Sequence, residues 1–229
     1  MKFGVVIFPG SNCDHDMIYT LESIMGHEVV QLWHKDGLIP KVDAIALPGG
    51  FTYGDYLRSG AIAKFSPIMN EVVKFANKGG YVFGICNGFQ ILTESELLPG
   101  ALLRNLSQKY ICKNQYILAD NCKSAFTAYA GSKPLNIPIA HGEGRYYASE
   151  DVLKEIEDNG QVIFRYCDEK GRITDEDNPN GSINYIAGVC NKNKNVYGMM
   201  PHPERAADPE LANTDGLFIL ESLVKWMNR

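Results

Sequence analysis

Cys86 is the residue whose type and position most directly suggest chemistry. It lies in the segment "YVFGICNGFQIL" (residues 81–92), where strand-forming residues end in Gly-Ile-Cys-Asn-Gly and a helical pattern begins at once. A Gly-x-nucleophile-x-Gly turn between a strand and a helix holds its central side chain out over the sheet in strained geometry. The start of the next helix favours a thiolate and can hold a developing oxyanion. Cys86 is therefore a candidate nucleophile, although a glycine-bounded turn can also be purely structural.

A cysteine nucleophile needs a general base and usually a carboxylate that orients the base. Two His-x-Glu motifs offer such a pair: His141 with Glu143 in "HGEGRYY", and His202 with Glu204 in "MMPHPERA". In an extended segment, residues two apart point the same way, so either glutamate could hold its imidazole. Prolines on both sides of His202 fix the backbone beyond a predicted strand, whereas two glycines predict a mobile loop after His141. The residues favour His202 and leave His141 open. The other three histidines are most simply structural: His15, His27 and His34.

A second glycine-rich turn, "LPGGFTYGD" (residues 47–55), is predicted at the end of a neighbouring strand. Its Gly49-Gly50 pair can supply a backbone N–H opposite the N–H of Asn87, which directly follows the cysteine. Two converging N–H donors form an oxyanion hole. The same end of the sheet is thus predicted to hold both the nucleophile and the groups that stabilise charge on its substrate.

The elements that must position these residues alternate between strands and helices through the first hundred residues. The segments "KFGVVIF", "HEVVQLWH", "VDAIALPGG" and "YVFGI" are predicted strands, and helical or polar segments lie between them. Ser66 and Pro67 predict a capped helix start, and Gly79-Gly80 its end. Continuously apolar strands in this order predict an α/β fold: a doubly wound, mostly parallel sheet with helices on both faces. Ligands of such sheets bind at the carboxyl ends of the strands.

The second half of the chain has a different character. Segments such as "KYICKNQYILADN" and "QVIFRYC" predict a β-rich, antiparallel extension, and "GLFILESLVKWMNR" predicts a docked terminal helix. The stretch "DEKGRITDEDNPNGS" (residues 168–182) is the most hydrophilic, and we expect an exposed hairpin loop there. One domain over residues 1–229 is the expected organisation.

Composition narrows the class of protein. The 229 residues carry a formal net charge of −5 and contain no basic block, which argues against nucleic acid and anionic membranes as partners. No targeting segment and no apolar run of membrane-spanning length is present. Six scattered cysteines in a chain of this size predict a reduced, cytoplasmic protein in which every cysteine except Cys86 is a buried small hydrophobe. The usual zinc-ligand spacings are absent, so no metal is expected.

Taken together, "PGGFTYGDYLRSGAIA", "GICNGFQIL" and "MMPHPER" resemble the class I glutamine amidotransferases. The segments "GGFTYGDYLR", "HGEGRY" and "PHPER" are similar to those of the stand-alone glutaminase subunits of phosphoribosylformylglycinamidine synthases. The resemblance covers nearly the whole chain. The resemblance implies that Cys86 attacks the side-chain amide of glutamine, releases ammonia and forms a γ-glutamyl thioester. It also implies that His202 is the base and that Glu204 orients it.

The resemblance extends to residues around this triad. It implies that the backbone N–H groups of Gly50 and Asn87 form the oxyanion hole. It places three residues where the family holds glutamine: Gln90, Asn105 and Ser107. Three others are left to line the pocket mouth or to contact a synthetase: His141, Glu143 and Arg145.

No motif for nucleotide phosphates occurs in the chain, so an ATP-dependent step must occur on another polypeptide. The resemblance implies a large synthetase subunit that uses ATP and Mg²⁺, and a small third subunit. Ammonia would pass through a protected route to formylglycinamide ribonucleotide, giving formylglycinamidine ribonucleotide in purine synthesis. No cofactor is expected in this chain.

Two other functions fit the same residues. A cysteine hydrolase such as a γ-glutamyl peptidase could use the same turn, histidine and glutamate. A regulatory protein could keep the fold and lose catalysis, but the joint presence of Cys86, His202 and Glu204 argues against that.

Overall fold

The computed structural model describes residues 1–120 and 124–229, and these form two compact units. Unit 1 comprises residues 1–98 and 195–198, and unit 2 comprises residues 99–194 and 199–229. The predicted single domain over residues 1–229 stays a prediction. Among the described residues, no helix combines the length and the apolar character needed to cross a membrane.

Unit 1 is built on a sheet of neighbouring strands. They lie in the order β2 (Glu28–Trp33), β1 (Lys2–Ile7), β3 (Ala44–Leu47), β4 (Tyr81–Ile85) and β11 (Val196–Met199). The pairs β1–β2, β1–β3 and β3–β4 are all parallel. All four residues of β3 are buried, as are the central four of β1 and the last four of β4. This continuous burial is what the apolar runs predicted, because strands covered on both faces have no polar side.

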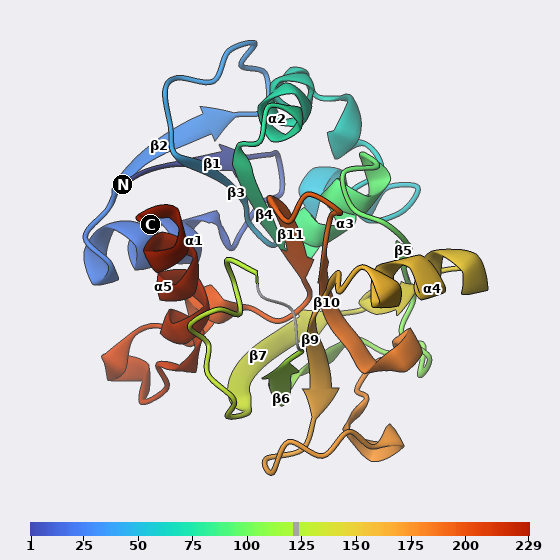
Figure 1. The fold of residues 1–229 in the computed structure, drawn as a ribbon. Helices are drawn as coiled ribbons and strands as arrows, with labels where there is room; N and C mark the ends of the chain where they lie inside the picture. Colours follow the sequence, from blue (N-terminus) through green and yellow to red (C-terminus); the bar gives the residue numbers. More distant parts are fainter. Residues whose placement is uncertain (121–123) are drawn as a thin grey trace. The chain divides into compact units, whose positions relative to one another are not determined.

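Helices connect these strands and cover them. The helix α1 (Asp14–Tyr19), continued by a π-helical segment Thr20–Ile24, joins β1 to β2, and α2 (Pro67–Asn77) leads into β4. From β1 to β2 the chain moves toward one edge of the sheet, and from β3 to β4 it moves toward the opposite edge. Right-handed crossovers therefore place α1 and α2 on opposite faces of the strands, as Figure 1 shows. The third helix, α3 (Asn87–Glu94), starts directly after β4.

The predicted start of α2 at Pro67 is confirmed, but the predicted helix cap by the Ser66 side chain is wrong. Pro67 occupies the first turn as expected, and Ser66 before it has an extended backbone. The Ser66 hydroxyl, however, donates to the carbonyl of Ala63 at 2.7 Å, so it caps no helical N–H. The preceding 3₁₀ turn, Ala63–Phe65, offers the carbonyl that captures this hydroxyl.

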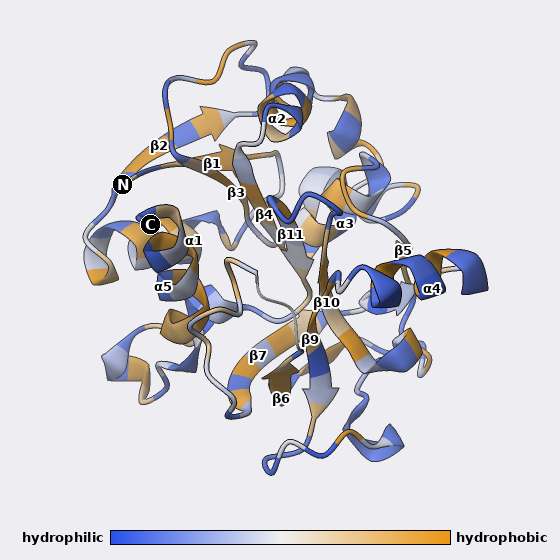
Figure 2. Cartoon of the chain, viewed as in Figure 1, coloured by the Kyte–Doolittle hydropathy of each residue, from blue (hydrophilic) through white to orange (hydrophobic). Residues whose placement is uncertain are grey.

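Unit 2 contains the β-rich half of the chain. Its strands β10 (Ile186–Cys190), β9 (Val162–Cys167), β6 (Ile111–Ala119) and β7 (Leu135–His141) lie in that order and are antiparallel to one another. A separate pair joins β5 (Ala101–Leu103) to β8 (Arg145–Tyr147). The helices of this unit are α4 (Glu150–Asp158) and α5 (Asp215–Met227). Figure 2 shows α4 mainly in the colours of hydrophilic residues, which agrees with its single buried side chain, Ile156. The predicted α/β fold with a β-rich second half is confirmed.

The prediction that every cysteine except Cys86 is buried is wrong for one described residue. Cys13, Cys167 and Cys190 are buried, whereas Cys112 on β6 is exposed, and Cys122 lies outside the described residues. Strand β6 pairs with β9 only from Tyr116 onward, so its first residues, Cys112 among them, have that side open. A strand pattern in the sequence does not reveal which part of the strand a neighbour will cover.

Candidate active site

Cys86 occupies the sharp corner that its sequence context predicted. It is the residue between β4 and α3, with φ 50° and ψ −105°. A residue with a side chain rarely adopts such a backbone, and holding it costs about 1–3 kcal/mol. The side chain is buried, with 5% of its surface exposed. Strain of this kind persists only where the surroundings enforce it, which points to function and not to a chance turn.

The two glycines of the turn are required by close approach of the backbone. A Cβ on Gly84 would lie 2.5 Å from the carbonyl carbon and oxygen of Gly88. A Cβ on Gly88 would collide with the carbonyl oxygen of Leu47 on β3. The start of α3 therefore packs directly on the end of the neighbouring strand, and only glycine allows this.

The helix after Cys86 provides the electrostatics that a thiolate and an oxyanion need. Gln90 donates its backbone N–H to the Cys86 carbonyl at 3.1 Å, which makes Cys86 the N-cap of α3. The first N–H groups of a helix have no intrahelical acceptors, and the helix dipole adds partial positive charge there. Asn87, the expected oxyanion donor, is the first residue of this helix.

The side chain of Asn87 connects the cysteine turn to the second glycine-rich turn. Its Oδ1 accepts the backbone N–H of Thr52 at 3.1 Å, and its Nδ2 donates to Oε1 of Gln90 at 2.8 Å. Gly50, two residues before Thr52, has φ +146° and forms an isolated bridge with Ser11. A Cβ on Gly50 would lie 2.9 Å from the backbone of Ser11, so this position also excludes side chains. The two predicted oxyanion segments are thus joined by one buried amide.

Gln90 lies one helical turn after Cys86 and is buried. Because its Oε1 accepts from Asn87, the amide is anchored beside the cysteine turn. Its role as a glutamine contact stays a prediction.

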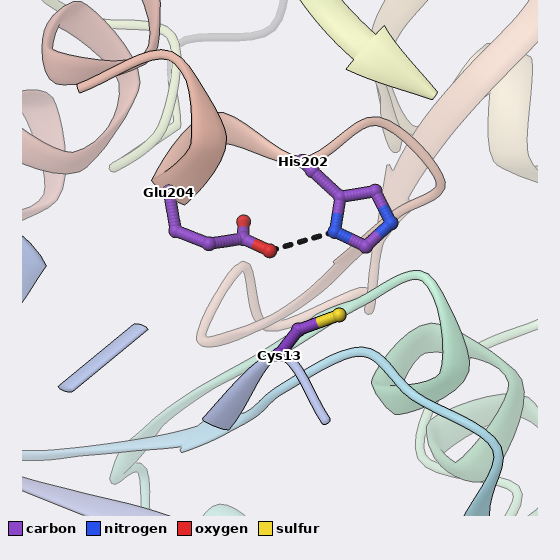
Figure 3. A group of neighbouring side chains, drawn as sticks. All are labelled: Cys13, His202 and Glu204. Atoms are coloured by element: carbon purple, nitrogen blue, oxygen red, sulfur yellow. Dashed lines mark hydrogen bonds and ion pairs between the residues drawn. The ribbon is translucent and has the colours of Figure 1, made fainter. Parts of the chain in front are cut away.

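His202 and Glu204 form a buried pair in unit 2. Nδ1 of His202 lies 2.6 Å from Oε1 of Glu204, and both residues are at least 96% buried. Figure 3 shows the carboxylate facing the imidazole, with Cys13 as the third labelled residue. Because a carboxylate accepts at Nδ1, the neutral imidazole carries its hydrogen on Nδ1 and leaves Nε2 as the basic nitrogen. This is the arrangement that a general base requires.

The backbone that presents this pair differs from the extended segment expected. Residues Pro203–Arg205 form a 3₁₀ turn, and the turn brings the glutamate back to the imidazole. The backbone N–H of His202 donates to the carbonyl of Pro138 on β7 at 2.8 Å, which fixes the histidine relative to the sheet of unit 2. The pairing of the two residues was predicted correctly and its backbone geometry was not.

The other His-x-Glu motif has a different arrangement. His141 is the last residue of β7, and its Nε2 lies 3.0 Å from Nδ2 of Asn180. Burial lowers the pKa of His141 to about 3, and the nearby charge of His202 acts in the same direction. Glu143 forms an ion pair with Arg104 at 3.8 Å, and Arg145 begins β8. A histidine that stays neutral throughout the physiological range is poorly suited to cycle a proton, so the geometry favours His202 as the base.

Asn105 holds the loop after His141 in place. It is fully buried; its Nδ2 donates to the carbonyls of Lys109 and His141 at 2.8 Å each, and its Oδ1 accepts the N–H of Gly144 at 3.0 Å. Ser107 is exposed, and its hydroxyl accepts the N–H of Lys109 at 3.3 Å. The glycines that predicted mobility are therefore tied down, and a Cβ on Gly144 would collide with the His141 ring. Contacts of Asn105 and Ser107 with glutamine stay predictions.

Sequence reasoning missed the contribution of Asn180. This residue lies near the end of the hydrophilic stretch 168–182, of which residues 172–176 are exposed as expected, but Asn180 and Ser182 are almost fully buried. The only sequence signal was the turn-forming "NPNG", which also suits a surface loop.

The fold and these residues define a class of protein: a buried cysteine at a strand-to-helix turn of a parallel sheet and, elsewhere in the chain, a buried His–Glu pair are typical of glutamine amidotransferases. The profile of the CobB/CobQ-like glutamine amidotransferase domain matches residues 1–224, and the chain belongs to this family.

The particular branch of the family is indicated by its relatives. The phosphoribosylformylglycinamidine synthase subunit PurQ of Trichormus variabilis is 54% identical over 98% of this chain and 97% of its own length. The PurQ subunit of Koribacter versatilis is 56% identical over 98% of this chain and 97% of its own. The PurLQS structure from Thermotoga maritima superposes with a TM-score of 0.85 at 42% identity, covering 99% of this chain and 98% of that chain. The resemblance to PurQ-type subunits is confirmed.

Proposed function

We propose that this chain is the glutaminase subunit of a phosphoribosylformylglycinamidine synthase in purine biosynthesis. The observation that carries the proposal is Cys86, held with a positive φ at the start of α3 by glycines that admit no side chain. The PurQ names of relatives that match this chain over nearly its whole length support the choice of pathway.

The first half-reaction makes a thioester. His202 takes the proton of the Cys86 thiol through its basic Nε2, and the sulfur attacks the side-chain amide carbon of glutamine. The backbone N–H groups of Gly50 and Asn87 hold the oxygen that becomes negative. His202 then returns the proton to the leaving nitrogen, the C–N bond breaks, and ammonia departs from a γ-glutamyl thioester.

The second half-reaction regenerates the thiol. A water molecule gives a proton to His202 as its oxygen attacks the thioester carbon. The C–S bond then breaks, the sulfur recovers the proton, and glutamate leaves. Glu204 stabilises the imidazolium in both halves, because its carboxylate accepts the hydrogen on Nδ1 at 2.6 Å.

The ammonia is used by other polypeptides. The partners we propose are a large synthetase subunit, which binds ATP and Mg²⁺, and a small third subunit, as the name PurLQS indicates for the Thermotoga complex. The synthetase converts formylglycinamide ribonucleotide to formylglycinamidine ribonucleotide. This chain needs no cofactor of its own, and the complex acts in the cytoplasm. His141, Glu143 and Arg145 are proposed to line the pocket mouth or to contact the synthetase.

The test compares two nitrogen sources in the reconstituted complex. Cys86→Ala should abolish synthesis from glutamine and leave synthesis from ammonium salts intact. Cys112→Ser, which changes the exposed cysteine of β6, is the matched control and should leave both activities unchanged. Loss of both activities in Cys86→Ala, or of neither, would contradict the proposal. Cleavage of γ-glutamyl peptides without glutamine-dependent synthesis would favour a hydrolase instead.

A further inference from the structure

The amide of Asn180 has only one possible orientation. Its Oδ1 accepts the backbone N–H of Ser182 at 3.1 Å and the Ser182 hydroxyl at 2.8 Å. Its Nδ2 donates to the backbone carbonyl of Gly144 at 2.8 Å. A backbone N–H can only donate and a carbonyl can only accept, so exchanging the amide oxygen and nitrogen would break both contacts.

This orientation determines the protonation state of His141. The same Nδ2 lies 3.0 Å from Nε2 of His141, and a donor there requires a lone pair on Nε2. The hydrogen of the neutral imidazole must then be on Nδ1. A second hydrogen on Nε2 would point at the Asn180 amide hydrogens, so the contact also opposes the charged form.

The arrangement is costly for a residue with a purely structural role. Nδ1 of His141 is buried and has no hydrogen-bond partner in the described part of the chain. A buried donor without an acceptor costs about 1–3 kcal/mol. The ring is nevertheless held firmly, because Asn105 binds the His141 carbonyl and Gly144 packs against the imidazole. Such a cost within a rigid surrounding is typical of functional positions.

The electrostatic neighbour of His141 is His202. The charge of His202 disfavours a charge on His141, and the effect is reciprocal. Other ionisable groups close to His141 in the chain are Glu143, which pairs with Arg104, and Arg145, the first residue of β8. The Tyr166 hydroxyl of β9 lies 3.2 Å from Nδ2 of Asn180, which has two hydrogens for three neighbours; the two shorter contacts, to the Gly144 carbonyl and to His141, are assigned these hydrogens. A positive charge on His141 would therefore act directly against an imidazolium on His202.

We propose that Asn180 is a positioning residue of the glutaminase reaction: it holds His141 as the neutral Nδ1–H tautomer, so that His202 can take up a proton without a second positive charge beside it. The inference rests on the proposed function of His202 as the general base. It gives a role to the end of the hydrophilic stretch 168–182, which reaches His141 through one buried amide.

The tautomer is tested first, in the full chain labelled with ¹⁵N-histidine. NMR should show His141 in the wild type with hydrogen on Nδ1 and not on Nε2. Asn180→Ala should move hydrogen to Nε2, the form preferred in water. Asn180→Asp presents an acceptor instead of a donor, so it should raise the pKa of His141 and populate the imidazolium. Unchanged His141 signals in both folded variants would overturn the proposal.

Catalysis is tested by the pH dependence of glutamate formation in the reconstituted complex. An opposite charge raises a neighbouring pKa by roughly 1–3 units, so the pKa of His141, about 3 in the wild type, should lie between roughly 4 and 6 in Asn180→Asp. The acid limb of kcat should then extend to higher pH: relative to the wild type, the rate should fall several-fold at about pH 5 and match the wild-type rate above about pH 7.5. Asn178→Ala is the control. This variant removes the hydrogen bonds to the N–H groups of Gly181 and Ser182 and leaves the Asn180–His141 contact intact, so it should not shift the acid limb of kcat.

An unchanged acid limb in Asn180→Asp, or an equal shift in Asn178→Ala, would refute the positioning role. If Asn180→Asp does not fold, Asn180→Ala provides the test: NMR should show the His141 hydrogen on Nε2, and kcat should fall while KM stays constant. Failure of the proposed function is distinguishable, because a wild-type complex that forms no glutamate would leave the NMR result on His141 and Asn180 standing.

Discussion

Lowering the pH is predicted to destabilise unit 2 through His141. The imidazole has an ordinary pKa of 6.5 in the unfolded chain and about 3 in the folded one, because burial opposes its charged form. Between these values the unfolded chain binds a proton that the folded chain does not, so stability falls as the pH falls. The contribution is fully present above pH 6.5 and is lost progressively toward pH 3.

The magnitude is set by the difference between the two values. At pH 5, about 1.5 units below the unfolded pKa, the loss is about 2 kcal/mol, since each unit corresponds to about 1.4 kcal/mol. His141→Gln is the matched variant, because its side-chain oxygen can still accept from Asn180 but does not titrate. The wild type should lose about 2 kcal/mol more than this variant between about pH 7.5 and about pH 5.

The assay is urea denaturation followed by the fluorescence of Trp226, which lies in unit 2, in a Trp33→Phe background. Comparing the two proteins removes the contributions of the other histidines, which are common to both. The m-value should stay constant, so that the midpoint reports stability. Equal losses in the wild type and in His141→Gln would refute the assigned burial and neutrality of His141.

Two further predictions concern the site. Gly88→Ala should destabilise unit 1 by about 1–3 kcal/mol or prevent folding, because the added Cβ would collide with the Leu47 carbonyl. The control Gly37→Ala places its Cβ in open space and should change the stability by less than about 0.5 kcal/mol. Similar melting temperatures for the two variants would contradict this prediction. Glu204→Gln should lower kcat for glutamine-dependent synthesis about 10³- to 10⁴-fold, because an amide cannot stabilise the imidazolium, while ammonia-dependent synthesis persists; a loss under about tenfold would remove Glu204 from the proposed triad.

The sequence predicted those parts of the fold that local patterns encode. The strand β4 has the bounds that "YVFGI" suggested, and α2 starts at Pro67. The turn at Cys86 was predictable because its glycines and the switch from strand to helix are adjacent in the chain. The pairing of His202 with Glu204 was predictable for the same reason, since the partners are two residues apart.

Features that depend on distant residues were not predictable. The exposure of Cys112 depends on where β9 stops covering β6. The amide of Asn87 reaches back 35 residues to the N–H of Thr52, and Asn180 reaches 39 residues to His141. No periodicity in the sequence records such contacts, because each requires the tertiary fold to bring two loops together.

The sequence by itself therefore predicted the candidate nucleophile and the candidate bases and determined the α/β class, all of which rest on residues adjacent in the chain. Only the tertiary structure decided the states of the two histidines. His202 faces a carboxylate at Nδ1, whereas His141 has its pKa lowered by burial and faces the Asn180 amide at Nε2. Both belong to a His-x-Glu motif, and the difference arises from their surroundings, since the protonation of an imidazole is set by what its two nitrogens face. Surroundings also decide the turn at Cys86: its glycines are visible in the sequence, but the tertiary structure makes Gly88 indispensable, because α3 packs on β3 at Leu47.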